Sequence, residues 1–168
     1  NRSISGLLIQ KAHYKNITNR IKDPKNFYQN QRKEIEIKND EYVNLSIIHY
    51  GGSSIIHLIY YIKTEDIFAL KELFDYENQK HLFERERENY LQLRHPFLLQ
   101  FYGTAQIKDH KGLLIEYING HSLNQIKKMK LSNEYKIKII FEIIMIIKFI
   151  HDQGFVFRDL KPSNIMID

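Results

Sequence analysis

Three short apolar runs between Tyr42 and Leu70 constrain the fold of this chain most. They span residues 42–48, 55–62 and 67–70, and they are rich in β-branched and aromatic side chains. Gly51-Gly52 and several charged residues interrupt them. Such runs, separated by turn-forming residues, are typical of β-strands. The sequence therefore predicts an antiparallel three-stranded meander.

The hydrophobic period changes after this meander. Residues 76–94 mix apolar and charged side chains at the spacing of an amphipathic helix, which we expect to end before His95-Pro96. Residues 98–102 and 113–118 indicate two further strands, and a turn at Asn119-Gly120 precedes a short helical stretch, 123–130. This order of elements predicts an α+β protein.

A long helix is expected to begin at Ser132, a favourable N-cap, and to end at Gln153, just before Gly154. Its interior, residues 137–150, is apolar on nearly every side, but it is too short for a membrane span and contains three charged residues. A helix of this kind is normally buried in a larger core. We therefore expect the sequence to stop inside a domain.

The composition excludes several functional classes. Of the 168 residues, 43% are hydrophobic and 27% charged, which is typical of a soluble globular protein. Because the chain has no cysteine, disulfides, thiolate zinc sites and iron–sulfur clusters are excluded. With no membrane span in the sequence either, a cytoplasmic location is the default expectation.

Most of the net charge of +5 belongs to residues 1–41, which hold nine Lys or Arg and five Asp or Glu. A basic arm of this kind can bind nucleic acid or an acidic membrane. The charges are scattered, so we favour a solvated N-terminal extension without regular structure and consider nucleic-acid binding the weaker alternative. The apolar run Ile4–Ile9 is compatible with a short helix or with no structure.

The strongest chemical signal is the sequence F-R-D-L-K-P-S-N at residues 157–164. Phosphoryl transfer requires a carboxylate to orient the attacking hydroxyl, a cation near the moving group and an oxygen ligand for magnesium. Asp159, Lys161 and Asn164 supply these three functions within six residues. The segment resembles the catalytic loop of eukaryotic protein kinases, H-R-D-x-K-P-x-N, with Phe157 in place of histidine.

Upstream residues match the same family in its order. Residues 68–71, F-A-L-K, resemble the strand whose lysine holds the α- and β-phosphates of ATP, here Lys71. A glutamate on the following helix should pair with this lysine. Glu84, Glu86 and Glu88 compete for that role, and the spacing to the R-H-P sequence at 94–96 favours Glu86.

Residues 113–120 resemble the hinge that joins the two kinase lobes. The resemblance implies that the carbonyl of Glu116 and the amide of Ile118 contact adenine, with Ile115 as the gatekeeper beside them. It also implies a ribose contact at Ser122. The apolar walls of the nucleotide pocket would come from three residues: Ile56, Ala69 and Met166.

The glycine-rich loop departs from the family pattern. By position Gly51 takes the place of the central glycine and Gly52 follows it, while His49 and Ser54 replace the flanking glycines. Glycine serves there because the backbone must approach phosphates closely. The loss of two glycines leaves the alternative of a pseudokinase that acts as a scaffold or allosteric partner.

Taken together, the resemblance implies the N-terminal part of a serine/threonine protein kinase domain that uses ATP and Mg²⁺. It implies a small lobe at 42–117, with a five-stranded antiparallel sheet and one helix, and the start of the large lobe at 118–168. The D-F-G motif, which supplies a magnesium ligand, would follow residue 168, so the isolated chain is expected to be inactive. Expected partners are a protein substrate and, through Arg158, an upstream activating kinase.

Overall fold

The computed structural model describes residues 2–4, 9–11, 34–126 and 130–167, and these form two compact units. One unit contains residues 31–91 and 100–117, and the other contains residues 1–30, 92–99 and 118–168. The predicted N-terminal extension, residues 1–41, lies mostly outside the described residues.

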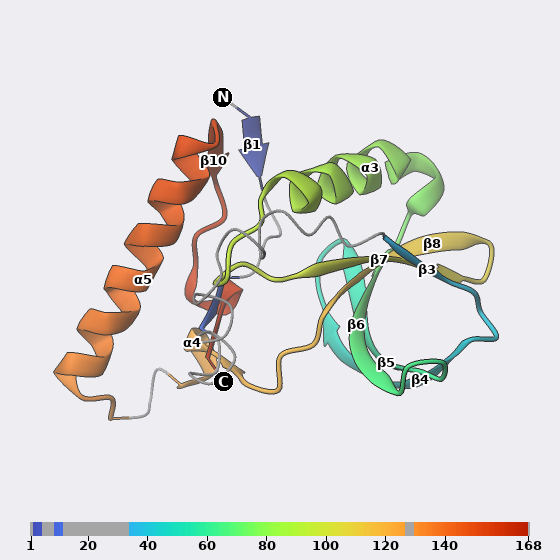
Figure 1. The fold of residues 1–168 in the computed structure, drawn as a ribbon, viewed down its shortest axis with the longest axis horizontal. Coiled ribbons are helices and arrows are strands. Elements are labelled where there is room, and N and C mark those ends of the chain that lie inside the picture. The colour runs from blue at the N-terminus through green and yellow to red at the C-terminus, as the bar shows by residue number, and fades with distance from the viewer. Residues whose placement is uncertain (1, 5–8, 12–33, 127–129, 168) are drawn as a thin grey trace. The chain divides into compact units, whose positions relative to one another are not determined.

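The first unit contains a six-stranded sheet and a helix (Figure 1). Along the sheet the strands lie in the order β3-β7-β8-β6-β5-β4. Their bounds are β3 Ile35–Ile37, β4 Tyr42–Tyr50, β5 Ser54–Tyr61, β6 Asp66–Leu73, β7 Phe101–Ile107 and β8 His110–Glu116. The α+β class and the small-lobe architecture predicted from the sequence are confirmed.

Two details of the predicted sheet are wrong. The expected five antiparallel strands are joined by a sixth, β3, which pairs in parallel with β7. Three residues are too few for an alternating pattern to be recognised. The strand expected at Leu98–Tyr102 instead begins at Phe101 and continues to Ile107, because a short apolar run does not distinguish a strand from a buried loop.

One hydrophobic cluster of this unit lies on one face of the sheet. Side chains that alternate along each strand meet there, as the two-residue period of a strand requires. Strand β3 contributes Ile37, which is fully buried. The other buried members of the cluster are Ile59, Tyr61, Phe68, Leu70, Ala105, Ile107 and Leu114.

Helix α3, Tyr76–Gln92, lies beside the sheet (Figure 1). Only three of its 17 residues are buried: Phe83, Asn89 and Tyr90. Ring contacts join the helix to the sheet, Tyr76 to His110 and Tyr90 to Phe101. Because few apolar side chains hold α3, its position also depends on polar contacts.

Gly103 allows the backbone of β3 to approach β7 closely. Its φ of +152° is strained for other residues, and a Cβ built on it would lie 1.9 Å from the carbonyl oxygen of Ile35. Ile35 is its register partner in the parallel pair. The sheet can therefore accept β3 only if residue 103 has no side chain.

The second unit contains α4 Leu123–Ile126, α5 Asn133–Asp152, a 3₁₀ turn at Pro162–Asn164 and five short strands. Strand β1, Arg2–Ile4, pairs with β10, Phe155–Phe157, while β11, Ile165–Ile167, lies between β2, Ile9–Lys11, and β9, His121–Ser122. The apolar run Ile4–Ile9, expected to be helical or unstructured, has its first residue in β1 and its last residue in β2. Residues 5–8 lie outside the described residues. Of the helical stretch expected at 123–130, residues 123–126 are helical and Lys130 is not, with 127–129 undescribed.

Helix α5 has the predicted N-cap: the hydroxyl of Ser132 accepts a hydrogen bond from the backbone N–H of Tyr135. One stripe of the helix, Ile139, Ile146 and Ile150, is buried. Five other large apolar residues of the helix are exposed, namely Ile137, Ile140, Phe141, Ile144 and Met145. Within the described residues, no helix has the length and apolar character needed to cross a membrane.

His95, in the second unit, is packed among aromatic rings. The ring centroid of Phe149 lies 4.8 Å away and that of Phe97 5.5 Å away, and the N–H of Phe97 donates to Nδ1 of His95. Burial lowers the pKa of His95 from 6.5 to about 4. The folded protein therefore holds this ring neutral.

Gly103→Ala should lower the free energy of unfolding by roughly 1–3 kcal/mol, because the new methyl group clashes with β3 and the backbone is strained. Chemical denaturation measures the loss, and hydrogen exchange at residues 35–37 should accelerate. Gly52→Ala is the control, since nothing lies within 4 Å of a Cβ at that position. Equal stability of the two variants would contradict the claim that β3 packs only against a residue without a side chain.

Acid should destabilise the protein partly through His95. As the pH falls below 6.5, His95 becomes protonated in the unfolded chain, whereas in the folded protein it stays neutral until about pH 4. The free energy of unfolding therefore falls as the pH is lowered across this interval. We expect His95→Gln to show a smaller drop in thermal midpoint between pH 7 and pH 5 than the unsubstituted chain. His121→Gln, at an exposed position, should show the full drop.

Candidate functional site

The first cluster of predicted site residues is an ion pair between β6 and α3. The ammonium group of Lys71 donates to both carboxylate oxygens of Glu86, at 2.6 and 2.8 Å. Both side chains are largely buried, with exposed fractions of 13% and 15%. Glu84 instead lies near Arg87, and Glu88 is exposed. Of the three competing glutamates, Glu86 is the one that contacts the lysine.

The chemistry of this pair suits a phosphate ligand. A lysine ammonium has three protons, and Glu86 receives two hydrogen bonds from Lys71. One proton remains for an anionic oxygen. The pair thus fixes the direction of the lysine and leaves it one donor.

Apolar residues share the sheet face of Lys71. Ile56 lies directly opposite Lys71 in the β5–β6 register, and Ala69 lies opposite Ile115 in the β6–β8 register. Residues opposite one another, and those two apart on a strand, project to the same face. The structure therefore brings Ile56, Ala69 and the predicted gatekeeper onto the face that carries the lysine.

Glu116, predicted to contact adenine through its carbonyl, ends strand β8. Its N–H donates to the carbonyl of Gln100, and its carboxylate accepts from the N–H of Gln100 at 3.3 Å. These bonds fix the end of the strand to the start of β7. Ile118, the second predicted adenine contact, belongs to the other unit and is partly buried there.

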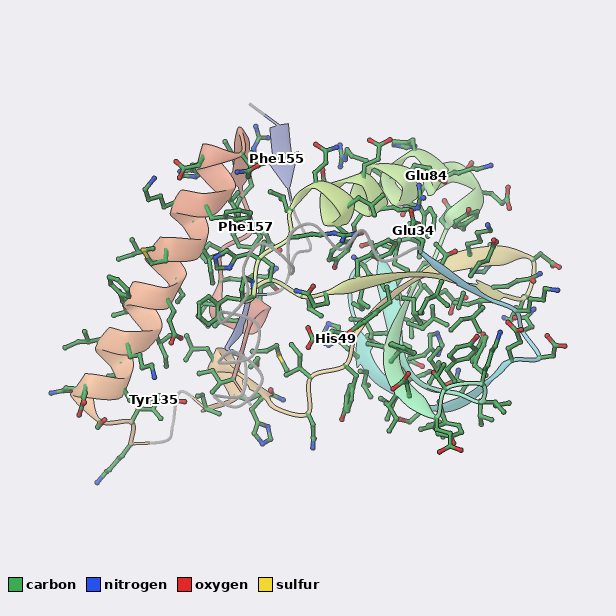
Figure 2. All side chains as sticks on the ribbon, in the orientation of Figure 1. Glu34, His49, Glu84, Tyr135, Phe155 and Phe157 are labelled. Atoms are coloured by element: carbon green, nitrogen blue, oxygen red, sulfur yellow. The ribbon has the colours of Figure 1, made fainter. Side chains whose placement is uncertain are left out.

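The predicted phosphate loop is the tight turn between β4 and β5. The N–H of Gly51 donates to the carbonyl of Ser54 at 2.8 Å, which closes the turn. His49 lies beside it at the end of β4 (Figure 2). Gly52, at the tip, has open space where a Cβ would project. The backbone of the turn is thus accessible at Gly52 even though the flanking glycines are absent.

The second cluster is the loop between β10 and the 3₁₀ turn. The side-chain amide of Asn164 donates to the backbone carbonyl of Asp159 at 2.9 Å and to its carboxylate at 2.8 Å. The ammonium of Lys161 lies 3.0 Å from the same carboxylate. The structure therefore brings together all three residues of the predicted catalytic loop.

Hydrogen bonds and charge set the protonation of Asp159. The hydrogen bond from Lys161 lowers the pKa of this carboxyl most, and the bond from Asn164 adds to the effect. At neutral pH the group is therefore an anion that accepts hydrogen bonds.

Asn164 also tests whether magnesium fits this loop. Its amide nitrogen is the atom that faces Asp159, so its carbonyl oxygen is left as an acceptor. Amide and carboxylate oxygens are suitable magnesium ligands. The donor set of the loop is compatible with the metal.

Ser122 and Met166 are register partners in the β9–β11 pair. The hydroxyl of Ser122 accepts from the N–H of Gln125 at 3.3 Å. Phe157, which replaces the family histidine, is buried at the end of β10 and is labelled in Figure 2.

The sequence did not predict the ion pair formed by Arg87, the residue next to Glu86. Arg87 on α3 binds Glu34, which lies just before β3 and is labelled in Figure 2. No local pattern reveals a contact between residues 53 positions apart. Only the alternation of charges on the helix hinted that Arg87 could be paired.

Comparison with known proteins agrees with this geometry. The sequence model of the family described as the protein kinase domain matches residues 42–168. The chain belongs to the protein kinase family. In this kinase chain the match includes the strand of Lys71, helix α3 and the loop of Asp159.

Three relatives show how the similarity is distributed. Phototropin-1A of Oryza sativa subsp. japonica is 30% identical over 125 residues, which cover 70% of this chain and 14% of the relative. A probable serine/threonine-protein kinase, pkgA, of Dictyostelium discoideum is 31% identical over 124 residues, 70% of this chain and 9% of its own length. Another probable serine/threonine kinase, IREH1 of Arabidopsis thaliana, is 28% identical over 134 residues, which cover 76% of this chain and 10% of the relative. The chain thus spans only a small part of each relative.

On the nucleotide role that the family resemblance implies for Lys71, Glu86→Gln should weaken magnesium–ATP binding by about tenfold, because hydrogen bonds between charged groups are worth about 1.5–3 kcal/mol and Lys71 loses its orientation. Isothermal titration measures the affinity. Glu88→Gln makes the same replacement of one carboxylate oxygen by an amide NH₂ at an exposed position of the same helix, and this variant should bind as the unsubstituted protein does. A larger loss in Glu88→Gln would reject the assigned pair.

Proposed function

We propose that the protein is a serine/threonine kinase that transfers the γ-phosphoryl group of ATP to a protein hydroxyl. The observation that carries this proposal is the loop in which Asn164 and Lys161 hold the carboxylate of Asp159. Phosphoryl transfer is catalysed mainly by positioning and charge stabilisation. A rigid anion beside a fixed cation suits this chemistry.

Asp159 would accept a hydrogen bond from the substrate hydroxyl and orient its oxygen toward the phosphorus. Since its pKa lies below the usual value, Asp159 is a weak base: it first orients the hydroxyl and takes its proton late, as the bond between oxygen and phosphorus forms. Its two hydrogen-bonded neighbours keep the carboxylate in one position. Productive alignment of this kind can supply several kcal/mol toward the barrier.

Lys161 would stabilise the charge of the transferring group. Its ammonium is bound to Asp159 at 3.0 Å, and the side chain is about half exposed, so it can reach a ligand oxygen without leaving the loop. The adjacent Pro162 begins the 3₁₀ turn that presents Asn164. A lysine at this position supports the serine/threonine class, and two of the relatives are named as probable serine/threonine kinases.

Asn164 would hold magnesium through its side-chain carbonyl oxygen. Magnesium, when bound, neutralises charge on the phosphates. The hydrogen bonds from the amide nitrogen to Asp159 fix the orientation in which that oxygen is offered.

The nucleotide would be held by the residues of the first unit. Lys71, oriented by Glu86, would offer its remaining proton to the α- and β-phosphates, and the turn closed by Gly51 would offer its accessible backbone at Gly52. Adenine would lie against Ile56 and Ala69, and the backbone of Glu116 would read its polar edge.

Regulation by an upstream kinase is part of the proposal. Arg158 is exposed beside Asp159, where its guanidinium could bind a phosphorylated segment.

Asp159→Asn should lower phosphoryl transfer by the full-length protein by roughly 10²–10⁴-fold, because the amide cannot accept the hydroxyl proton in the same way. Radiolabelled ATP with a generic protein substrate measures transfer at matched protein concentrations. Asp152→Asn, at the end of α5, is the control for the same chemical change on an exposed residue.

Three results separate the functions. Activity lost only in Asp159→Asn supports the kinase. Equal activity of the Asp159→Asn variant removes the role given to this carboxylate. A full-length protein that binds ATP but transfers nothing is the scaffold-type pseudokinase.

A further inference from the structure

The segment before β3 contacts the helix that carries Glu86. The carboxylate of Glu34 accepts two hydrogen bonds from Arg87, from Nε at 2.8 Å and from Nη2 at 2.6 Å. This fork-to-fork geometry is directional as well as strong. The two side chains are about a third exposed, so the pair is partly shielded from solvent. Figure 2 shows Glu34 close to α3.

Glu34 is fixed by the strand that follows it. Ile37 is fully buried in the sheet core, and Ile35 lies against Gly103, which has no side chain to obstruct it. Beyond the strand, the Asn39 side chain donates to the carbonyl of Lys108, and the Tyr42 hydroxyl donates to that of Gln106. The position of Glu34 is thus set by the sheet, and the carboxylate can act as a fixed point for the helix.

Two consecutive residues of α3 are therefore bound by partners on different sides of the helix. Glu86 is bound by Lys71 of β6, and Arg87 is bound by Glu34, while successive side chains of a helix point about 100° apart. Contacts on both sides resist rotation of the helix about its axis. The weaker contact between Glu84 and Arg87 lies within the helix, so it does not place α3 on the sheet.

We propose that Glu34 is a positioning residue, which acts through Arg87 to keep Glu86 in contact with Lys71. Residues 34–37 would then serve as a brace for α3, and any event that displaces this brace would loosen the lysine. The consequence for ATP rests on the proposed kinase function, but the effect on the ion pair does not.

The brace predicts that the reactivity of Lys71 depends on Glu34. An amine held between two carboxylate oxygens is acylated slowly, because it must lose both its proton and its partner. In Glu34→Gln we expect the rate of Lys71 acetylation by the N-hydroxysuccinimide ester of acetate to rise by about threefold, as befits a partly exposed ion pair. Mass spectrometry of the full-length protein measures this rate relative to the exposed Lys63.

Matched variants separate positioning from general damage. Glu36→Gln alters the same charge two residues along, in an exposed pair with Lys111, and should leave the Lys71 rate unchanged. Glu34→Asp should retain most of the protection, and the exchange Glu34→Arg with Arg87→Glu should restore it. Glu86→Gln is the positive control for release of the lysine.

The outcomes decide the proposal whether or not the protein is an active kinase. A raised Lys71 rate in Glu34→Gln, reversed by the charge exchange, supports the brace. A Lys71 rate that stays at the unsubstituted level in Glu34→Gln while it rises in Glu86→Gln overturns the brace and leaves the kinase assignment intact. Absence of phosphoryl transfer in every variant would reject the proposed function, yet the acetylation rates would still test the brace.

Discussion

The ion pair between Lys71 and Glu86 is the interaction on which the first unit depends. It joins a polar helix to a sheet strand that would otherwise share few apolar contacts with it. Both groups are mostly withdrawn from water, so removal of one partner would leave the other poorly solvated. The helix must therefore lie where the two charges meet, and every other contact of α3 has to be compatible with that position.

Charge also organises the second unit, by a different physical route. Asp159 is more exposed than Glu86, and it is held by a lysine two residues away and an asparagine five residues away. Short sequence separations make this loop a local structure, whereas the pair on α3 links residues 15 positions apart. The loop geometry thus depends on few other elements, while that of α3 depends on the whole sheet.

The sequence predicted elements whose signals are local. Ser132 capped α5 as expected, and the charge pattern located α3 to within two residues of its end. The pairing of Glu86 followed from spacing to a family motif. Strand β3 and the Glu34–Arg87 pair could not be predicted, because three residues carry no periodic signal and the contact depends on tertiary structure. Leu98 and Leu99 led to a strand being predicted too early in the sequence, because they are apolar and buried but precede β7, which starts at Phe101.

The choice of asparagine at position 164 has a consequence for how this loop can change. The side chain donates from its nitrogen on one side and offers its oxygen on the other, which an ionised carboxylate cannot do because it has no donor. Aspartate has nearly the same shape, but it would place a second anion within hydrogen-bonding distance of Asp159. Two such neighbours would share one proton, and the loop would become a titrating dyad whose geometry varies with acidity. A neutral amide at this point keeps the carboxylate of Asp159 ionised and gives the loop one structure across the physiological range.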